Sequence, residues 1–157
     1  MIDNSRLRVA IIGGRQATPA GIQFAYEVGR LLAENGVILY TGGGPGIMEA
    51  ASRGAHEAGG TVVGILKEED VASANKYVHI PIMTGMGDLR NGIIIRSVHG
   101  AIAVEGAYGT LSEVAFTLGY DKPALGFHTW DIKGLEAVEK PQLAVNRILE
   151  LINPENS

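Results

Sequence analysis

The chain has 157 residues, of which 46% are hydrophobic and 19% charged, with a formal net charge of −4 and no cysteine. This length and composition are typical of one globular domain, which we assign to residues 1–157. The lack of cysteine excludes disulfides, thiolate metal ligands and a cysteine nucleophile. The acidic balance, without a cluster of lysines or arginines, argues against nucleic acid as a partner.

No apolar run approaches membrane-spanning length, and residues 1–6 do not resemble a signal peptide. We therefore expect a cytoplasmic protein with no membrane contact. The composition stands out for its 22 glycines, which are grouped rather than spread along the chain. Grouped glycines indicate loops that form a site rather than low complexity.

The first half of the chain alternates between apolar runs and helix-like stretches. Thr18 and Pro19 form an N-cap and a first helical position, and Gly36 suits the left-handed end of that helix. Pro45 opens a second helix that stops at Gly59. The apolar runs between these signals predict three strands, at residues 9–12, 37–40 and 61–66.

The second half continues the alternation after a polar surface connection from Lys67 to Tyr77. Asp88 is the predicted cap of a helix, and Pro81 indicates that the strand around it ends or lies at an edge. The predicted strands are 78–82, 101–104 and 123–127. The predicted helices are 88–98, 111–119 and 142–152.

This strand–helix alternation predicts an α/β fold with a mostly parallel central sheet and right-handed crossovers. In such sheets a ligand binds outside the carboxyl ends of the strands, where the strand order switches. We therefore expect the turns that follow the strands to form the site.

Three glycine turns follow predicted strands: Gly13-Gly14-Arg15, Gly42 to Gly46, and Gly106 to Thr110. Glycine lets the backbone approach a ligand closely, and the free N–H groups of a helix start attract anions. None of the turns matches Gly-x-Gly-x-x-Gly or a Walker sequence, which disfavours a standard dinucleotide or ATP site. The predicted ligand-binding residues are Gly13, Gly14, Arg15, Gly42, Gly43, Gly44, Gly46, Met48, Gly106, Ala107, Tyr108, Gly109, Thr110 and His128.

Two of these stretches resemble the signatures of the LONELY GUY (LOG) family. Thr41 to Ala51 is similar to its first glycine signature, and Glu105 to Glu113 is similar to its Pro-Gly-Gly-x-Gly-Thr-x-x-Glu signature. The resemblance implies a Rossmann-like three-layer fold. It also implies a phosphoribohydrolase that releases the base from a nucleoside 5′-monophosphate, with Arg90 and Glu113 as its catalytic pair. A carboxylate suits the positive charge that develops on the ribose.

The sequence departs from the enzyme pattern at three positions. Glu105 replaces the proline and adds a negative charge beside the expected phosphate, Ala107 replaces a glycine, and Asn91 replaces the lysine that follows the arginine. A shorter branch fits better, because Gly42 to Ala51 and Gly109 to Phe116 resemble the molybdenum-cofactor carrier proteins. That resemblance implies the molybdenum cofactor, a phosphorylated pterin, as a carried ligand.

The sequence allows two interpretations for several side chains. Glu113 could form a capping box with Thr110 or act in the site, and Arg15 could clamp an anion or be solvated. Arg90 lies at a helix start, which is an unfavourable place for a cation, so this position favours a ligand or carboxylate partner. His128 follows the sixth strand at the ligand edge, whereas the other histidines lack the spacing of metal ligands, so we expect no metal held by the protein itself.

Three functional hypotheses follow. The first is a carrier or binding protein for the molybdenum cofactor, the second a phosphoribohydrolase, and the third a nucleotide-sensing module without turnover. We favour binding over catalysis and leave enzymatic activity open. The run Ile93-Ile94-Ile95 covers more than one helix face, which predicts a homodimer or higher homo-oligomer or, alternatively, burial under the chain's own C-terminal segment.

Overall fold

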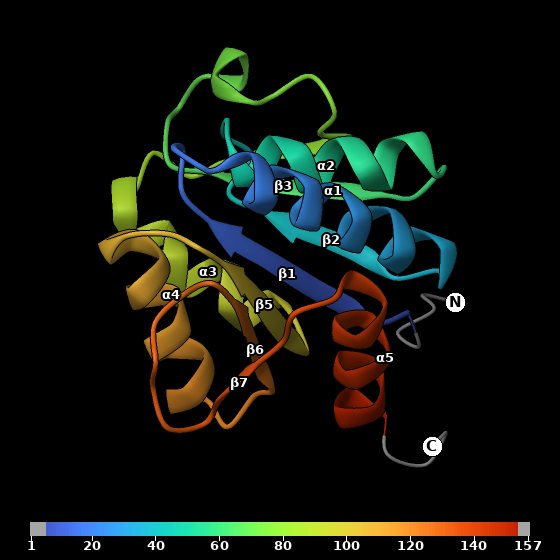
Figure 1. Ribbon diagram of the computed structural model, residues 1–157. Coiled ribbons are helices and arrows are strands. Elements are labelled where there is room, and N and C mark those ends of the chain that lie inside the picture. The colour runs from blue at the N-terminus through green and yellow to red at the C-terminus, as the bar shows by residue number, and fades with distance from the viewer. Residues whose placement is uncertain (1–5, 154–157) are drawn as a thin grey trace.

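The computed structural model describes residues 6–153, so both ends of the predicted domain, residues 1–5 and 154–157, lie outside the described range. Figure 1 shows the arrangement of the elements. The strands are β1 (Arg8–Gly13), β2 (Ile38–Thr41), β3 (Val62–Leu66), β4 (Ile80–Met83), β5 (Gly100–Val104), β6 (Ala124–Phe127) and β7 (Leu135–Ala137). The helices are α1 (Pro19–Glu34), α2 (Ile47–Glu57), α3 (Arg90–Ser97), α4 (Tyr108–Gly119) and α5 (Pro141–Ile152), with 3-10 turns at Val71–Ser73 and Gly87–Leu89.

The strands form one seven-stranded sheet in the order β4-β3-β2-β1-β5-β6-β7, and every pairing in it is parallel. The predicted α/β, Rossmann-like three-layer fold is confirmed. The strand order reverses between β1 and β5, whose last residues, Gly13 and Val104, are register partners. The crevice expected at such a switch point lies beyond these two residues.

Two apolar clusters hold the helices on opposite faces of the sheet (Figure 1). Val9 and Ile11 of β1 face α1, α2 and α5, whereas Ala10 and Ile12 face α3 and α4. This alternation is the period-two pattern of a strand that is buried on both faces. A Cβ atom on Gly54 of α2 would overlap the backbone of α1, so glycine sets the close approach of these helices.

Several predicted boundaries were wrong. Strand β7 was missed, because its three residues include the exposed Glu136 and lack an apolar pattern. Helix α4 begins at Tyr108, three residues before the predicted start. Pro45 precedes α2, whose N-cap is Gly46, and Asp88 does not cap α3, whose N-cap position is Leu89. The predictions for Thr18, Pro19 and Gly36 are confirmed, with Thr18 accepting a hydrogen bond from the Gly21 N–H.

Within residues 6–153, no helix combines the length and the apolar composition needed to cross a membrane. The same residues contain no group of three or more histidine, aspartate or glutamate side chains placed to hold a metal ion.

Candidate functional site

Two neighbouring hollows lie beyond the carboxyl ends of the strands. The smaller, here called the inner hollow, has a volume of about 150 Å³ and is lined by Ile12, Gly13, Gly14, Arg15, Gly42, Met48, Lys67, Asp88, Arg90, Asn91, Ala107, Gly109, Thr110 and Glu113. The larger, here called the outer cavity, has a volume of about 860 Å³ and is lined by residues 14–18, residues 105–107 and His128. Gly14, Arg15 and Ala107 line both. The three predicted glycine turns therefore meet at one crevice.

The glycine turn from Gly42 to Gly46 contributes its first residue to the inner hollow, while its later glycines shape the turn. The Asn75 amide donates to the carbonyl oxygens of Gly43 (3.2 Å) and Gly44 (3.0 Å). Gly46 has a φ of 73°, and a Cβ there would overlap the Gly14 carbonyl oxygen. Only glycine suits such a position. Gly43, Gly44 and Gly46 do not line either hollow.

The start of α4 opens into the inner hollow, which Gly109 and Thr110 line. In α2 the first N–H, on Ile47, donates to the Gly14 carbonyl oxygen at 3.1 Å, while those of Met48 and Glu49 have no acceptor among the described residues. In α4 the N–H groups of Tyr108, Gly109 and Thr110 have no acceptor among the described residues. They form the exposed positive end of a 12-residue helix, which favours an anion.

The predicted capping box is wrong, because α4 begins earlier than expected. Thr110 lies inside the first turn of α4, and the N-cap position is Ala107, which has no side-chain cap bond. Thr110 and Glu113 are instead buried residues that line the inner hollow. Of the two interpretations of Glu113, capping alone is therefore excluded.

Arg90 is buried and braces two strands. Its Nη1 donates to the carbonyl oxygen of Gly42 at 2.8 Å and also to that of Ile65, and its Nε donates to Asn91 Oδ1 at 2.8 Å. Burial lowers the pKa of Arg90, and the nearby Glu113 is the largest influence that raises it. The expected ligand or carboxylate partner is not among these hydrogen bonds, and the guanidinium serves the architecture of the inner hollow.

The Glu113 side chain is 6% exposed. It has no hydrogen-bond or ion-pair partner among residues 6–153, and its oxygen atoms are not sealed from the inner hollow. Burial raises the pKa of this carboxyl group to about 7, against the opposing effect of Arg90 and with a smaller contribution from Asp88. The group is thus poised to exchange a proton near neutral pH.

Two further charged residues of the inner hollow, Lys67 and Asp88, were not predicted as site residues. Lys67 Nζ lies 3.8 Å from Asp88 Oδ1, and Arg15 Nη2 lies 3.5 Å from Glu68 Oε1. Lys67 directly follows β3, so the same strand-end rule that identified the glycine turns could have found it. Arg15 forms this ion pair with Glu68 at the rim, and its side chain is 55% exposed. Its role as a clamp for an anion stays a prediction.

The expected conflict at Glu105 does not arise, because its side chain turns away from the inner hollow. The Glu105 carboxylate accepts hydrogen bonds from the Thr18 N–H, at 3.0 Å, and from the Thr18 hydroxyl. Its negative charge therefore lies at the positive end of α1.

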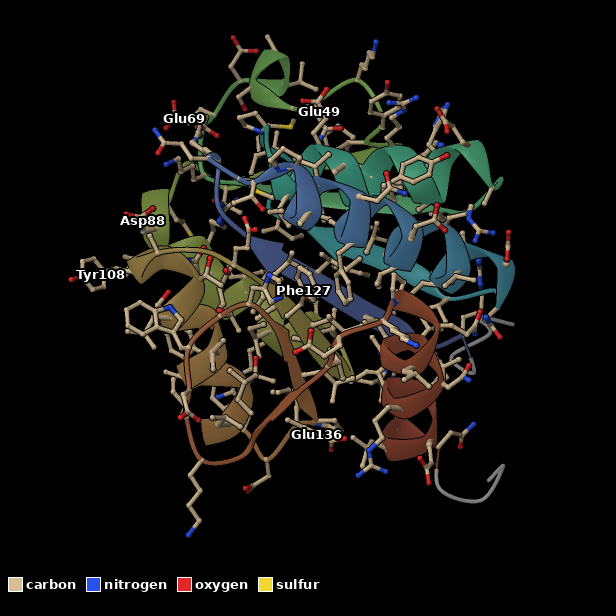
Figure 2. All side chains as sticks on the ribbon, viewed as in Figure 1. Glu49, Glu69, Asp88, Tyr108, Phe127 and Glu136 are labelled. Atoms are coloured by element: carbon tan, nitrogen blue, oxygen red, sulfur yellow. The ribbon has the colours of Figure 1, made fainter. Side chains whose placement is uncertain are left out.

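Aromatic side chains lie at the edge of the outer cavity and at the start of α4. His128 lines the outer cavity, and its ring stacks on that of Phe127 with centroids 3.9 Å apart. Tyr108, 80% exposed, points away from the body of the molecule at the start of α4 (Figure 2) and stacks on Trp130 at 6.0 Å. Tyr108 lines neither the inner hollow nor the outer cavity.

The other histidines are engaged in structural contacts. His99 Nδ1 accepts a hydrogen bond from the Arg8 N–H at 3.0 Å, and His79 Nδ1 accepts one from the Val62 N–H at 3.1 Å. Burial lowers the pKa of both His79 and His99. His99 therefore anchors the start of β1.

Comparison with known proteins places the chain in a defined group. The family model described as the SLOG cluster4 family matches residues 6–155. An uncharacterised protein from Archaeoglobus fulgidus is 39% identical over 142 residues, which are 89% of this chain and 93% of that protein. The cytokinin riboside 5′-monophosphate phosphoribohydrolase LOG of Oryza sativa subsp. japonica is 29% identical over 108 residues, which are 66% of this chain but 43% of the rice protein.

Two solved structures superpose on nearly the whole chain. The molybdenum cofactor binding protein from the phototrophic bacterium Rippkaea orientalis gives a TM-score of 0.90 at 32% identity, covering 96% of this chain and 99% of that one. The molybdenum cofactor carrier protein from Chlamydomonas reinhardtii gives a TM-score of 0.83 at 29% identity, covering 94% of this chain and 98% of that one.

Proposed function

Because the chain belongs to the SLOG cluster4 family, a LOG-like Rossmann family, we propose that it binds a phosphorylated small molecule in its crevice, as a binding or carrier protein for the molybdenum cofactor. The observation that carries this proposal is the end-to-end superposition, at a TM-score of 0.90, on a protein described as binding that cofactor. The rice phosphoribohydrolase, in contrast, is matched over less than half of its length.

The proposed phosphate position is the start of α4. The open N–H groups of Tyr108, Gly109 and Thr110 offer hydrogen bonds to phosphate oxygens. Lys67 and Arg15 stand at the rim with positive charge. The remainder of the ligand extends past Gly14 and Ala107, which the inner hollow and the outer cavity share, into the larger volume.

The state of the two would-be catalytic groups favours binding without cleavage. The Arg90 guanidinium donates its hydrogen bonds to the carbonyl oxygens of Gly42 and Ile65 and to the side chain of Asn91. The Glu113 carboxyl, with a pKa of about 7, is protonated in half of the molecules at that pH. A neutral acid stabilises a positively charged ribose poorly, whereas it repels a bound phosphate less than a carboxylate would.

A second candidate is a phosphoribohydrolase that cleaves nucleoside 5′-monophosphates. It is favoured by the meeting of Arg90, Glu113 and Thr110 in one hollow and by the likeness to the rice enzyme. A carboxyl group with a pKa near 7 also suits proton transfer. A nucleotide-sensing module without turnover remains the third hypothesis, because the same crevice would serve it.

We further propose that the protein is a homodimer or higher oligomer in the cytoplasm. Leu89 at the start of α3 is 76% exposed, and Ile80 and Ile82 are exposed on the edge strand β4. Ile93 is half-buried, while Ile94 and Ile95 are buried in the chain's own core. Contiguous exposed apolar patches commonly mark contact surfaces, and these residues are the proposed centre of such a patch. Analytical ultracentrifugation tests this part of the proposal.

The main experiment incubates the protein with AMP and with isopentenyladenosine monophosphate while free base is measured by chromatography. We expect no release of base at enzyme-like rates. In parallel, purified molybdenum cofactor is added and its retention is measured after gel filtration, where we expect saturable binding. Release of base that disappears in Glu113→Ala would replace the carrier proposal with the hydrolase proposal. If the protein failed to retain the cofactor, the carrier proposal would be wrong.

A further inference from the structure

A chain of three side-chain hydrogen bonds runs from the buried Arg90 to the first turn of α4. Arg90 Nε donates to Asn91 Oδ1 at 2.8 Å, and Asn91 Nδ2 donates to Ser112 Oγ at 3.1 Å. The Ser112 hydroxyl in turn donates to the carbonyl oxygen of Gly109 at 2.6 Å. The chain therefore connects the start of α3 with the start of α4.

The direction of every hydrogen bond in this chain is fixed by chemistry. A guanidinium group only donates, so the Asn91 oxygen faces Arg90 and the Asn91 nitrogen faces Ser112. The Ser112 oxygen accepts from Asn91, and its own hydrogen is directed to the Gly109 carbonyl oxygen. All three bonds therefore point the same way, from the positive charge toward α4. Bonds aligned in this way polarise one another, and each is strengthened by roughly 10–30%.

The acceptor at the end of the chain belongs to a peptide group of the candidate phosphate site. The Gly109 carbonyl shares its peptide bond with the Thr110 N–H, and peptide resonance links the two groups. A hydrogen bond to the carbonyl oxygen draws electrons from the nitrogen, so the Thr110 N–H becomes a stronger donor. This N–H has no acceptor among the described residues, and Gly109 and Thr110 both line the inner hollow. Glu113, which is 6% exposed and has no partner within residues 6–153, lines the same hollow.

We propose that Asn91 and Ser112 are positioning residues of the phosphate site. They hold the first turn of α4 against α3 and transmit the polarising effect of the Arg90 charge to the Thr110 N–H. Arg90 thereby favours a bound anion although its own hydrogen bonds go to protein atoms. Asn91, which departs from the enzyme pattern, has a role in binding under this proposal. The inference rests on the proposed function, which puts the phosphate of the ligand at the start of α4.

The test follows the isotope-labelled protein by NMR at pH 6 while sulfate, whose oxygens stand in for those of phosphate, is added. The Thr110 amide signal of the parent should shift with sulfate and so report the dissociation constant. Ser112→Ala removes the last bond of the chain. In this variant the carbonyl carbon signal of Gly109 should move upfield, and sulfate should bind about threefold more weakly.

Two further variants separate the hydrogen-bond chain from a general effect of the substitution. Ser112→Thr keeps a hydroxyl that can bond the preceding turn, so the Gly109 carbonyl signal and the sulfate affinity should both return toward those of the parent. In Asn91→Asp the carboxylate accepts from both of its neighbours and draws the Ser112 hydrogen away from Gly109. The upfield shift of the Gly109 carbonyl signal should therefore appear with Ser112 unchanged.

The matched control is Ser97→Ala in the last turn of α3. The Ser97 hydroxyl donates to the Ile93 carbonyl oxygen at 2.7 Å, which is the same kind of bond within a helix, but neither residue lines the inner hollow. This variant should keep the sulfate affinity of the parent. An equal loss of affinity in Ser97→Ala and Ser112→Ala would assign the effect to the helices in general and overturn the inference.

The failure of this inference differs from the failure of the proposed function. Equal sulfate affinities of the parent and Ser112→Ala, with a Thr110 signal that responds to sulfate in both, would overturn the inference and leave the proposed phosphate position standing. If the Thr110 signal of the parent did not respond to sulfate, the phosphate position itself would be wrong, and the inference would fall with it.

Discussion

Arg90 Nη1 donates a hydrogen bond to the carbonyl oxygen of Gly42, 2.8 Å away, and so ties the start of α3 to the glycine turn after β2. The same nitrogen also donates to the Ile65 carbonyl oxygen in β3. A residue that a family resemblance marks as catalytic thus connects the turn after β2 with the neighbouring strand β3. The shape of the inner hollow depends on this contact, because Gly42 and Arg90 both line it.

The first prediction concerns Gly42→Ala. The new Cβ would lie 2.7 Å from Arg90 Nη2 and 2.8 Å from Met48 Sδ, distances at which the neighbours must shift. We expect a loss of about 2 kcal/mol in the free energy of unfolding, as for other overpacked sites. Urea denaturation measures this loss of stability.

The matched control is Gly119→Ala at the end of α4, where a Cβ would meet no atom within 4 Å. Alanine suits a helix better than glycine, so this variant should be stabilised by up to about 1 kcal/mol. Equal stability losses in the two variants would contradict the role assigned to the Gly42–Arg90 contact.

The second prediction concerns stability and pH. The Glu113 pKa is raised from 4.5 to about 7 by burial, so the folded state holds a proton that the unfolded state releases between these values. The free energy of unfolding contributed by this group therefore falls as pH rises through that window and reaches its lowest level above it. Glu113→Gln removes the effect. It should be more stable than the parent by up to about 3 kcal/mol at pH 8 and similar to it near pH 4.

Chemical denaturation at a series of pH values provides the measurement. A Glu113→Gln variant that is less stable than the parent at pH 8 would show that the ionised carboxylate is a favourable partner of Arg90 instead.

The third prediction concerns anion binding at the start of α4. Sulfate stays doubly charged between pH 6 and pH 8, whereas Glu113 changes from mostly neutral to mostly ionised over the same range. Sulfate should bind about fivefold more tightly at pH 6, because a nearby negative charge is removed. In Glu113→Gln the affinity for sulfate should be high at both pH values. A parent-like pH dependence in this variant would place the titrating group elsewhere.

The fourth prediction concerns Asn75, whose side chain holds the carbonyl oxygens of Gly43 and Gly44. Asn75→Ala should cost about 1–2 kcal/mol, since the Gly44 carbonyl oxygen and the Tyr77 N–H lose their partner, whereas the Gly43 carbonyl oxygen keeps the backbone N–H of residue 75. It should also weaken phosphate binding, because the turn that supports Gly42 loosens. Thermal unfolding and calorimetry measure the two effects. Asn146→Ala, which removes an exposed amide of α5 that bonds only Gln142, should change neither.

Much of the fold could be predicted from local signals. The apolar runs at residues 9–12 and 101–104 are buried central strands, and Thr18 caps α1 as expected. The errors occurred where a local signal was weak or ambiguous. Strand β7 is short and partly exposed, and the capping-box pattern at Thr110 matches a helix start that lies three residues upstream. Helix boundaries depend on how the chain packs at the turn, which periodicity does not encode.

The sequence by itself determined the parallel α/β architecture, the family and the edge at which the glycine turns gather, because strand period, turn chemistry and motif spacing are local properties. Only the tertiary structure decided what the charged residues there do. Glu105 turns to Thr18, 87 positions away, and Arg90 reaches Ile65, 25 positions away. The pKa of Glu113 depends on the burial of its carboxyl group. Desolvation and contacts between distant segments arise when the sheet assembles, so no local pattern along the chain could express them.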